Sequence, residues 1–255
     1  MIDRHHPATL VPVSIDIRAI TLDLDDTLWP FAPIALRIET ALHAWFEQHS
    51  PQTAVQFPPH THRQLRLDLL ERHPELAHDV SRLRRLGIEH VLRESGGDVG
   101  LADAAYAAFQ VERNRVDFYP DALPALHRIA ARLPVAALTN GNADLQTIGI
   151  ADLFAFRLTP AEHGTAKPDP GIFLAACERL GLPPQQVLHV GDDVDADIHG
   201  AHRAGLRSGW MHRSDAHARY PHWPEHAGFQ PDLIVPDMTA LADWLDAHLA
   251  HRTAA

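Results

Sequence analysis

Four segments of the chain carry continuous apolar runs rather than alternating ones. They read "IRAITLDL" (17–24), "PVAALTN" (134–140), "QQVLHVGDD" (185–193) and "DLIVP" (232–236). Continuous short runs are typical of strands that are buried on both faces of a parallel sheet. Two weaker strand candidates are "FAFRLT" (154–159) and "RSGWMH" (207–212).

Helical patterns lie between these strands, at 121–133, 169–182, 195–206 and 238–250. Strand–helix alternation favours an open α/β sheet with right-handed crossovers. The pattern therefore predicts an α/β fold with a parallel sheet.

Residues 31–116 interrupt this alternation, because they contain helical patterns and no convincing strand. The helical stretches span 32–49, 60–73, 74–95 and 101–116, with Pro, Gly or polar breaks between them. We expect a helical insert directly after the first strand. The predicted domains are a core formed by 1–30 and 117–255 and an insert formed by 31–116, with hinges near Pro30–Pro33 and Asp117–Pro120.

Composition narrows the possible partners. The formal net charge is -11 and no dense Lys/Arg block offsets it, which argues against nucleic acid. No apolar run approaches the roughly 20 residues of a membrane span, and the N-terminus lacks a signal-peptide pattern. Cys177 is the single cysteine, and the 20 histidines form no zinc motif. We expect a cytoplasmic protein, and its oligomeric state stays open.

Acidic residues gather where the predicted strands end. Asp23 and Asp25 follow the first strand, and Asp192 and Asp197 follow the third. The carboxyl ends of parallel strands face one crevice, where these groups would raise one another's pKa unless a cation were present. Mg²⁺ takes a few carboxylates and keeps water or phosphate oxygens as its other ligands. The pattern predicts a Mg²⁺ site and an anionic substrate.

Phosphate-binding groups accompany the carboxylates. Thr139 and Asn140, in "LTNGN", supply a hydroxyl, an amide and backbone N–H groups at a strand end. Lys167, in "GTAKPDPG", is the single lysine among 22 Lys and Arg residues. A compact ammonium is not equivalent to a guanidinium, so this exception indicates a site that requires it; chance in an arginine-rich composition is the alternative.

Four motifs occur along the chain in this order: "DLDDT" (23–27), "LTNGN" (138–142), "AKP" (166–168) and "GDDVDAD" (191–197). In this order the chain, from 17 to about 210, resembles the haloacid dehalogenase superfamily of phosphatases. One such motif is weak support, whereas four in order are specific. The resemblance implies an open parallel Rossmann-like sheet, and it implies that the insert is a small helical cap that closes over the crevice and selects small phosphorylated metabolites.

The resemblance also implies roles for the motif residues. Asp23 would attack phosphorus and form an aspartyl-phosphate. Asp25 would protonate the leaving oxygen and then activate water. Thr139, Asn140 and Lys167 would hold the phosphoryl oxygens.

The implied Mg²⁺ ligands are Asp23, Asp25 through its backbone carbonyl, Asp192 and Asp197, with Asp193 as the competitor of Asp197. Asp26 is expected to serve turn or capping chemistry rather than catalysis. True dehalogenases of the superfamily lack an acid at the position of Asp25, so phosphoryl transfer is favoured.

More narrowly, the chain looks like bacterial phosphatases that hydrolyse FMN and 5-amino-6-(5-phosphoribitylamino)uracil, in riboflavin metabolism. The cap string "HDVSRLR" carries this likeness, and His78, Asp79, Arg82 and Arg84 are candidate substrate contacts, or an ordinary charged helix face. Trp29, Trp45 and Phe46 could stack on a ring, although such residues are more often core. The long Pro/His-rich loop at 212–232 has no assigned role.

Other functions remain open from the sequence. Within the same fold they are a sugar-phosphate or nucleotide phosphatase, a phosphomutase and a 2-haloacid dehalogenase. A receiver-like phosphoacceptor would be shorter and would lack a cap. An inactive metabolite-binding protein of this fold is disfavoured, because no essential motif residue is missing.

Overall fold

The structure is a computed structural model that describes residues 16–213, 222–224 and 228–253. The expected lack of a signal segment concerns residues outside these ranges, as does much of the 212–232 loop. No helix in the described ranges has the length and apolar character that crossing a membrane requires.

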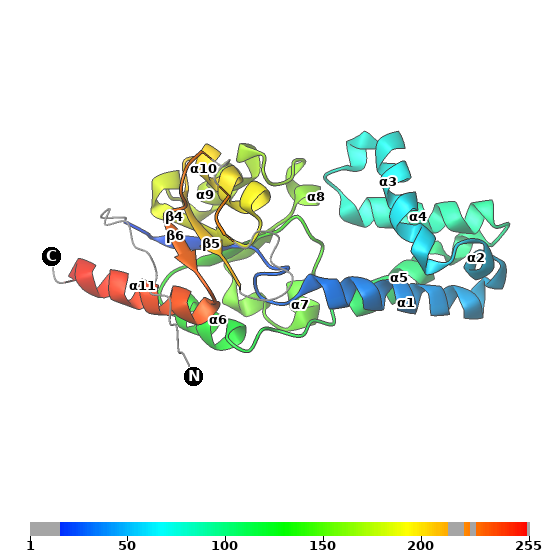
Figure 1. Ribbon diagram of the computed structural model, residues 1–255, viewed down its shortest axis with the longest axis horizontal. Helices are drawn as coiled ribbons and strands as arrows, with labels where there is room; N and C mark the ends of the chain where they lie inside the picture. Colours follow the sequence, from blue (N-terminus) through cyan, green and yellow to red (C-terminus); the bar gives the residue numbers. More distant parts are fainter. Residues whose placement is uncertain (1–15, 214–221, 225–227, 254–255) are drawn as a thin grey trace.

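A six-stranded parallel sheet forms the centre of the molecule (Figure 1), with the strand order β3-β2-β1-β4-β5-β6. The strands are β1 (Ala19–Leu22), β2 (Val135–Leu138), β3 (Phe156–Leu158), β4 (Val187–Gly191), β5 (Arg207–Met211) and β6 (Leu233–Val235). Every neighbouring pair is parallel. The predicted open α/β sheet is confirmed, and both weaker strand candidates belong to it.

Helices cover both faces of this sheet. On one face, α6 (Ala122–Ala130) and α11 (Met238–Thr253) share an apolar cluster with β1, which includes Ile20, Leu126 and Leu241. On the other face lie α9 (Pro170–Leu180) and α10 (Gly200–Arg203), whose cluster includes Phe173 and Ala201. Burial on both faces explains why the strands read as continuous apolar runs. The short helices α7 (Leu145–Ile148) and α8 (Pro160–His163) were not predicted.

The predicted helix at 195–206 is divided in the structure. A π-helical turn, η6 (Val194–His199), precedes α10. Asp193 caps this turn, since its side chain accepts hydrogen bonds from the backbone N–H groups of Asp195 and Ala196. The cap explains why the helical segment begins beside the end of β4.

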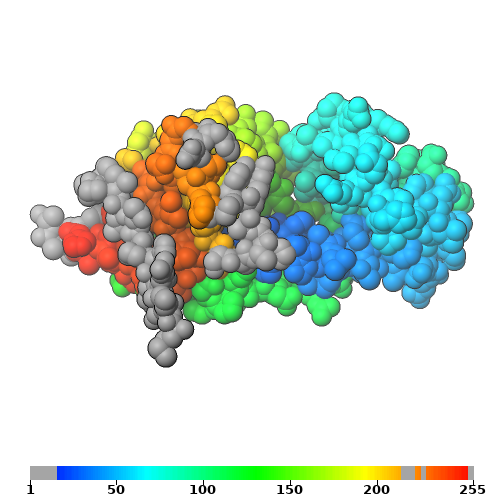
Figure 2. Space-filling view, in the orientation of Figure 1, coloured from blue at the N-terminus to red at the C-terminus, as the bar shows by residue number. Residues whose placement is uncertain are grey.

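Helices α1 to α5 form a helical unit between β1 and β2 in the chain, with an apolar cluster around Phe46 and Leu92. Ile34, Ile38 and Phe109 of this unit belong to the apolar cluster of the sheet. Figure 2 shows part of it, in blue and cyan, as a lobe beside the rest of the molecule. Its helices are α1 (Phe31–His49), α2 (Pro51–Gln56), α3 (His62–Arg72), α4 (Val80–Glu94) and α5 (Ala102–Arg113). The stretch predicted as one helix at 74–95 is the turn η2 (Pro74–Leu76) followed by α4, which the Asp79 side chain caps by accepting from the Arg82 N–H.

Two adjacent chain segments join the helical unit to the sheet. The Tyr119 N–H donates to the Leu28 carbonyl at 3.0 Å. Beside this bond, the rings of Trp29 and Phe118 make an edge contact with centroids 5.4 Å apart. The outgoing and returning connections therefore lie together, near the carboxyl end of β1.

Candidate functional site

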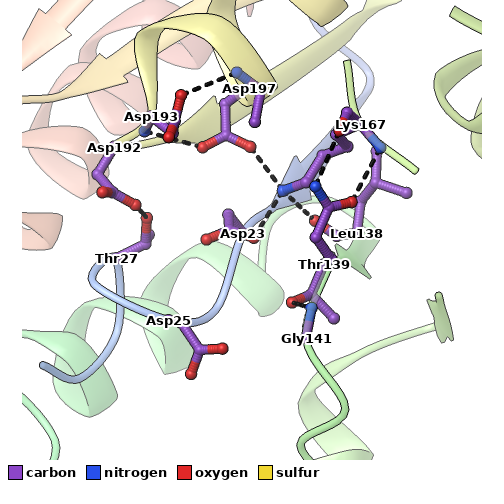
Figure 3. Close-up of polar contacts among 12 residues, drawn as sticks. Asp23, Asp25, Thr27, Leu138, Thr139, Gly141, Lys167, Asp192, Asp193 and Asp197 are labelled. Atoms are coloured by element: carbon purple, nitrogen blue, oxygen red, sulfur yellow. Dashed lines mark hydrogen bonds and ion pairs between the residues drawn. The ribbon is translucent and has the colours of Figure 1, made fainter. Parts of the chain in front are cut away.

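Strand register brings three sequence motifs to one edge of the sheet. Leu22 of β1 lies opposite Ala137 of β2 and Val190 of β4. The residues that follow these strands therefore leave the sheet at the same level, and Figure 3 shows Asp23, Thr139 and Asp192 around one centre. This is the crevice that the sequence predicted.

Lys167 connects the strand ends. Its ammonium donates to Asp23 Oδ1 at 2.6 Å, to Asp197 Oδ1 at 2.5 Å and to the Leu138 carbonyl at 2.8 Å. Lys167 is 5% exposed and Asp197 is 1% exposed, so both charges are withdrawn from water. Charge-assisted bonds of this kind offset the cost of burying the groups.

Two further groups, besides Lys167, hold the Asp197 carboxylate in place. The Asp193 N–H donates to its Oδ2 at 3.0 Å, and His189 Nε2 lies 3.1 Å from its Oδ1. His189 is fully buried in β4, and its Nδ1 lies 2.9 Å from the Thr21 hydroxyl. A β-carbon at position 191 would overlap the Asp197 carboxylate, so Gly191 permits this approach.

Burial and mutual charge shift the ionisation of these groups. Burial raises the pKa of Asp23 to about 7, and Asp197 adds to the rise while Lys167 opposes it. Burial raises the pKa of Asp192 well above its usual range, with Asp197 and Asp23 adding to it. Burial also acts to raise the pKa of Asp197, but Lys167 and His189 hold it well below its usual range. Carboxylates that lie close together raise one another's pKa unless a cation lies between them.

The donor set fits a divalent cation. One oxygen each from Asp23, Asp192 and Asp197 lie within 4.8 Å of one another. Hard cations prefer such carboxylate oxygens. Asp197 uses both of its oxygens in the contacts above, whereas Asp192 uses one, accepting from the Thr27 hydroxyl at 3.2 Å. Asp193 is committed to capping η6.

Asp25 is directed differently from Asp23. Its Oδ1 accepts from Trp29 Nε1 at 2.8 Å, and its Oδ2 accepts from a guanidinium nitrogen of Arg113 at 2.6 Å. The neighbouring Asp26 has a left-handed backbone (φ 59°), and its side chain accepts from the Phe31 N–H at the start of α1. Turn chemistry is the role that the sequence predicted for Asp26.

The predicted phosphate-binding residues lie beside Lys167. Thr139 is 1% exposed, and its hydroxyl oxygen accepts from the Gly141 N–H at 2.9 Å. Asn140 pairs with the backbone of Lys167: it accepts from its N–H and donates to its carbonyl, each at 2.9 Å. The Asn140 amide therefore positions the lysine loop against the end of β2.

A cavity of about 500 Å³ lies between the site and the helical unit. Asp25, Asn140, Gly141 and Asn142 line one part of it. Apolar side chains line its walls: Phe31, Ala35, Ile38, Leu67, Leu70, Val80, Leu83 and Phe109. The cavity is therefore polar beside Asp25 and Asn140 and apolar along its walls.

Charged residues of the helical unit also line the cavity. Glu39 accepts from Arg66 at 2.6 Å and from Arg84 at 3.1 Å, and its other oxygen lies 2.6 Å from His62 Nδ1. Arg84 lies over the Phe109 ring at 5.0 Å. Hydrogen bonds and charge from its partners outweigh burial and lower the pKa of Glu39 to about 2.

The other predicted contacts of the helical unit do not line this cavity. His78 and Asp79 line a second cavity, of about 230 Å³, together with Asn140 and Asn142. Arg82 is exposed. Trp29 and Phe46 are fully buried core residues, and Trp45 stacks on His49 at 4.3 Å.

Sequence reasoning missed four residues of this region: His189, Trp29 as a donor to Asp25, Glu39 and Arg113. His189, Glu39 and Arg113 contact partners far away in the chain, so no local pattern singles them out. Trp29 lies only four residues from Asp25, but the contact depends on the turn that returns the indole to the carboxylate. The one available signal was the position of His189 within the strand that leads into "GDD".

Comparison with known proteins agrees with this geometry. The family model of haloacid dehalogenase-like hydrolases matches residues 17–205. A solved 2-haloacid dehalogenase from Pseudomonas syringae superposes with a TM-score of 0.79 at 33% identity, over 89% of this chain and 99% of that chain.

Curated relatives include several phosphatases. The 5-amino-6-(5-phospho-D-ribitylamino)uracil phosphatase of Escherichia coli is 36% identical over 199 residues, which is 76% of this chain and 83% of the relative. The glyceraldehyde 3-phosphate phosphatase of Methanopyrus kandleri is 31% identical over 207 residues, 74% of this chain and 82% of the relative. The chain therefore belongs to the haloacid dehalogenase-like hydrolases, and its similarity to these curated phosphatases makes it a phosphoric monoester hydrolase.

Proposed function

We propose that the protein is a Mg²⁺-dependent phosphatase that hydrolyses a small phosphate monoester through an aspartyl-phosphate on Asp23. The observation that carries the proposal is the placement of Asp23. Its carboxylate lies at the end of β1, within 2.6 Å of the Lys167 ammonium and beside Asp192. This placement supports Asp23 as the nucleophile, Lys167 as the cation beside it and Asp192 as a metal ligand.

The first half of the reaction transfers the phosphoryl group to the enzyme. An Asp23 oxygen forms a bond to phosphorus while the bond from phosphorus to the ester oxygen breaks. Asp25 gives its proton to that oxygen, and the alcohol leaves. In the second half, Asp25 takes a proton from water, the water oxygen bonds to phosphorus, and the bond to Asp23 breaks to release phosphate.

Lys167 and Thr139 would hold the phosphoryl oxygens, with Asn140 positioning the lysine loop beside them. Asp23, Asp192 and the Asp25 carbonyl would hold Mg²⁺, which supplies a Lewis acid for the phosphoryl oxygens. Asp197 would support this shell by fixing Lys167 from behind. The roles are consistent with oxygens of Asp23, Asp192 and Asp197 lying within 4.8 Å of one another.

The helical unit, residues 31–116, would act as a cap that excludes water and selects the substrate. Its cavity is apolar along the walls and carries the Glu39, Arg66 and Arg84 cluster. Such a chamber suits an ester whose phosphate-distant part is a ring with hydrogen-bonding edges. FMN and the ribitylaminouracil phosphate named for the Escherichia coli relative have this chemistry.

A second candidate, 2-haloacid dehalogenase activity, comes from the name of the Pseudomonas syringae structure. Asp25 favours the phosphatase, because a dehalogenase expels a halide that needs no proton from an acid. Sugar-phosphate or nucleotide hydrolysis stays within the proposed reaction and changes only the substrate.

The proposal is tested by incubating the protein with Mg²⁺ and a panel of FMN, 5-amino-6-(5-phosphoribitylamino)uracil, nucleotides and sugar phosphates, with 2-chloropropionate as the competing substrate. Release of inorganic phosphate supports the proposal. Release of chloride without phosphate would move the protein to the dehalogenases, and an isomerised sugar phosphate would indicate a mutase.

A further inference from the structure

Arg113, the last residue of α5, is a buried arginine that reaches into the catalytic region from the helical unit. It is 2% exposed. Its guanidinium donates to Asp25 Oδ2 at 2.6 Å and, through Nε, to Asn142 Oδ1 at 2.9 Å, and it lies over the Phe31 ring at 5.3 Å. A charge this buried is costly unless it is paired, so Arg113 depends on Asp25 as its carboxylate partner.

The direction of Asp25 depends on two donors. Arg113 holds one carboxylate oxygen and Trp29 holds the other. Figure 3 shows the resulting Asp25 carboxylate turned away from the Lys167 ammonium, while Asp23 is turned toward it. Trp29 is part of the core, whereas Arg113 belongs to the helical unit.

The contact continues back into the helical unit. Asn142, which accepts from Arg113, donates through its Nδ2 to the Ser81 hydroxyl at 3.1 Å. Ser81 lies in the first turn of α4, so members of the core and of the helical unit alternate along the series Asp25, Arg113, Asn142, Ser81. Moving the helical unit relative to the sheet must break or rebuild bonds in this series.

Two local features show that Asp25 and Arg113 are tightly packed against their surroundings. A β-carbon at position 141 would lie 2.6 Å from Asp25 Oδ2 and 2.8 Å from the Arg113 nitrogen, so Gly141 leaves the room for the pair. In the part of the chain that the structure describes, the remaining guanidinium nitrogen of Arg113 is buried and has no hydrogen-bond partner. Arg113 also lines the large cavity.

We infer that Arg113 is a positioning residue that orients Asp25 for proton transfer and links that orientation to the placement of the helical unit over the site. The inference rests on the proposed phosphatase function, in which Asp25 protonates the leaving oxygen. It predicts a selective defect in the first half of the reaction, because only a poor leaving group depends strongly on a correctly placed acid. The second half, in which Asp25 acts as a base, is the same for every ester.

The test compares kcat/KM, which covers the reaction only through release of the alcohol, on p-nitrophenyl phosphate, which has a good leaving group, and on ethyl phosphate, which has a poor one. Both esters are small, so neither depends on the far part of the cavity. Arg113→Met is expected to lower kcat/KM on ethyl phosphate about 10²-fold and on the aryl ester less than about tenfold. Arg113→Lys should recover part of the loss on ethyl phosphate.

Arg85→Met is the matched control, since Arg85 lies on α4 and pairs with Glu89 away from Asp25. Circular dichroism and thermal unfolding check that the variants fold. If Arg113→Met does not fold, Asn142→Leu is used instead, because it removes the hydrogen bond that orients Arg113. It should show the same selective loss of activity on ethyl phosphate, by a smaller factor.

The outcomes separate the two hypotheses. A loss on both esters by the same factor, or no loss on either, overturns the role of Arg113 while the phosphatase stands. A wild-type protein that releases phosphate from neither ester and from no metabolite of the panel above overturns the proposed function, and this inference with it.

Discussion

The Lys167 ammonium lies 2.5 Å from Asp197 Oδ1, with Asp197 at 1% exposure, so the single lysine of the chain is held from behind by a buried carboxylate. Burial alone would lower the pKa of Lys167, but Asp197 and Asp23 raise it above its usual value. The lysine is thereby kept charged, with Asp23 on its other side at 2.6 Å.

Replacing this lysine should be severe even when charge is kept. Lys167→Arg is expected to lower kcat on p-nitrophenyl phosphate by about 10²–10³-fold, because a guanidinium is wider and needs fork geometry, whereas the ammonium contacts three acceptors as a compact charge. Arg128→Lys, on the exposed pair with Asp243, is the control and should behave like wild type. Wild-type kinetics for Lys167→Arg would contradict the assignment of Lys167 as the cation that holds the phosphoryl oxygens, and would assign that role to an arginine.

Asp23→Asn is expected to abolish turnover and to leave the fold intact, since an amide does not attack phosphorus comparably. Phosphate release and circular dichroism measure the two parts of the expectation. Retention of more than about 10% of wild-type activity would favour attack by a metal-activated water instead.

Chelation should silence the enzyme reversibly. EDTA is expected to remove activity, added Mg²⁺ to restore it, and Ca²⁺ to substitute poorly, because Ca²⁺ prefers more ligands and looser geometry. The assay is initial-rate phosphate release before and after metal addition. Full activity in EDTA would contradict a metal role for Asp23 and Asp192.

Mg²⁺ binding should depend on pH near neutrality. Burial raises the pKa of Asp23 to about 7, so at lower pH the metal-free carboxyl holds a proton that Mg²⁺ must displace. Affinity is therefore expected to increase as pH rises through about 7. Calorimetric titration in buffers of different ionisation enthalpy would detect the released proton, and a pH-independent affinity with no proton release would refute the prediction.

Arg84 should govern substrate choice more than chemistry. It lines the cavity beside Glu39 but makes no contact with Asp23 or Lys167 in the described residues. Arg84→Ala is expected to lower kcat/KM on FMN at least about tenfold, as for a lost hydrogen bond to a charged group, and to leave p-nitrophenyl phosphate nearly unchanged. Arg82→Ala, at an exposed position of the same helix, is the control. Equal losses on both substrates would show a structural role instead.

The sequence by itself determined the sheet, the place of the helical unit and the motif residues at the strand ends. Continuous apolar runs follow from burial on both faces, and parallel strands direct their carboxyl ends to one edge. Asp23, Thr139 and Asp192 were therefore predictable as neighbours, because each lies directly after a recognisable strand.

The tertiary structure alone decided which oxygens and nitrogens meet. Asp197 points to Lys167 and His189, Asn140 pairs with the lysine backbone, and Arg113 returns from the far end of the helical unit to Asp25. The Arg113–Asp25 contact joins residues 88 positions apart, and its direction depends on how α5 packs beside α1. Local patterns report burial and periodicity, whereas such contacts depend on where distant elements are placed, so only the folded chain reveals them.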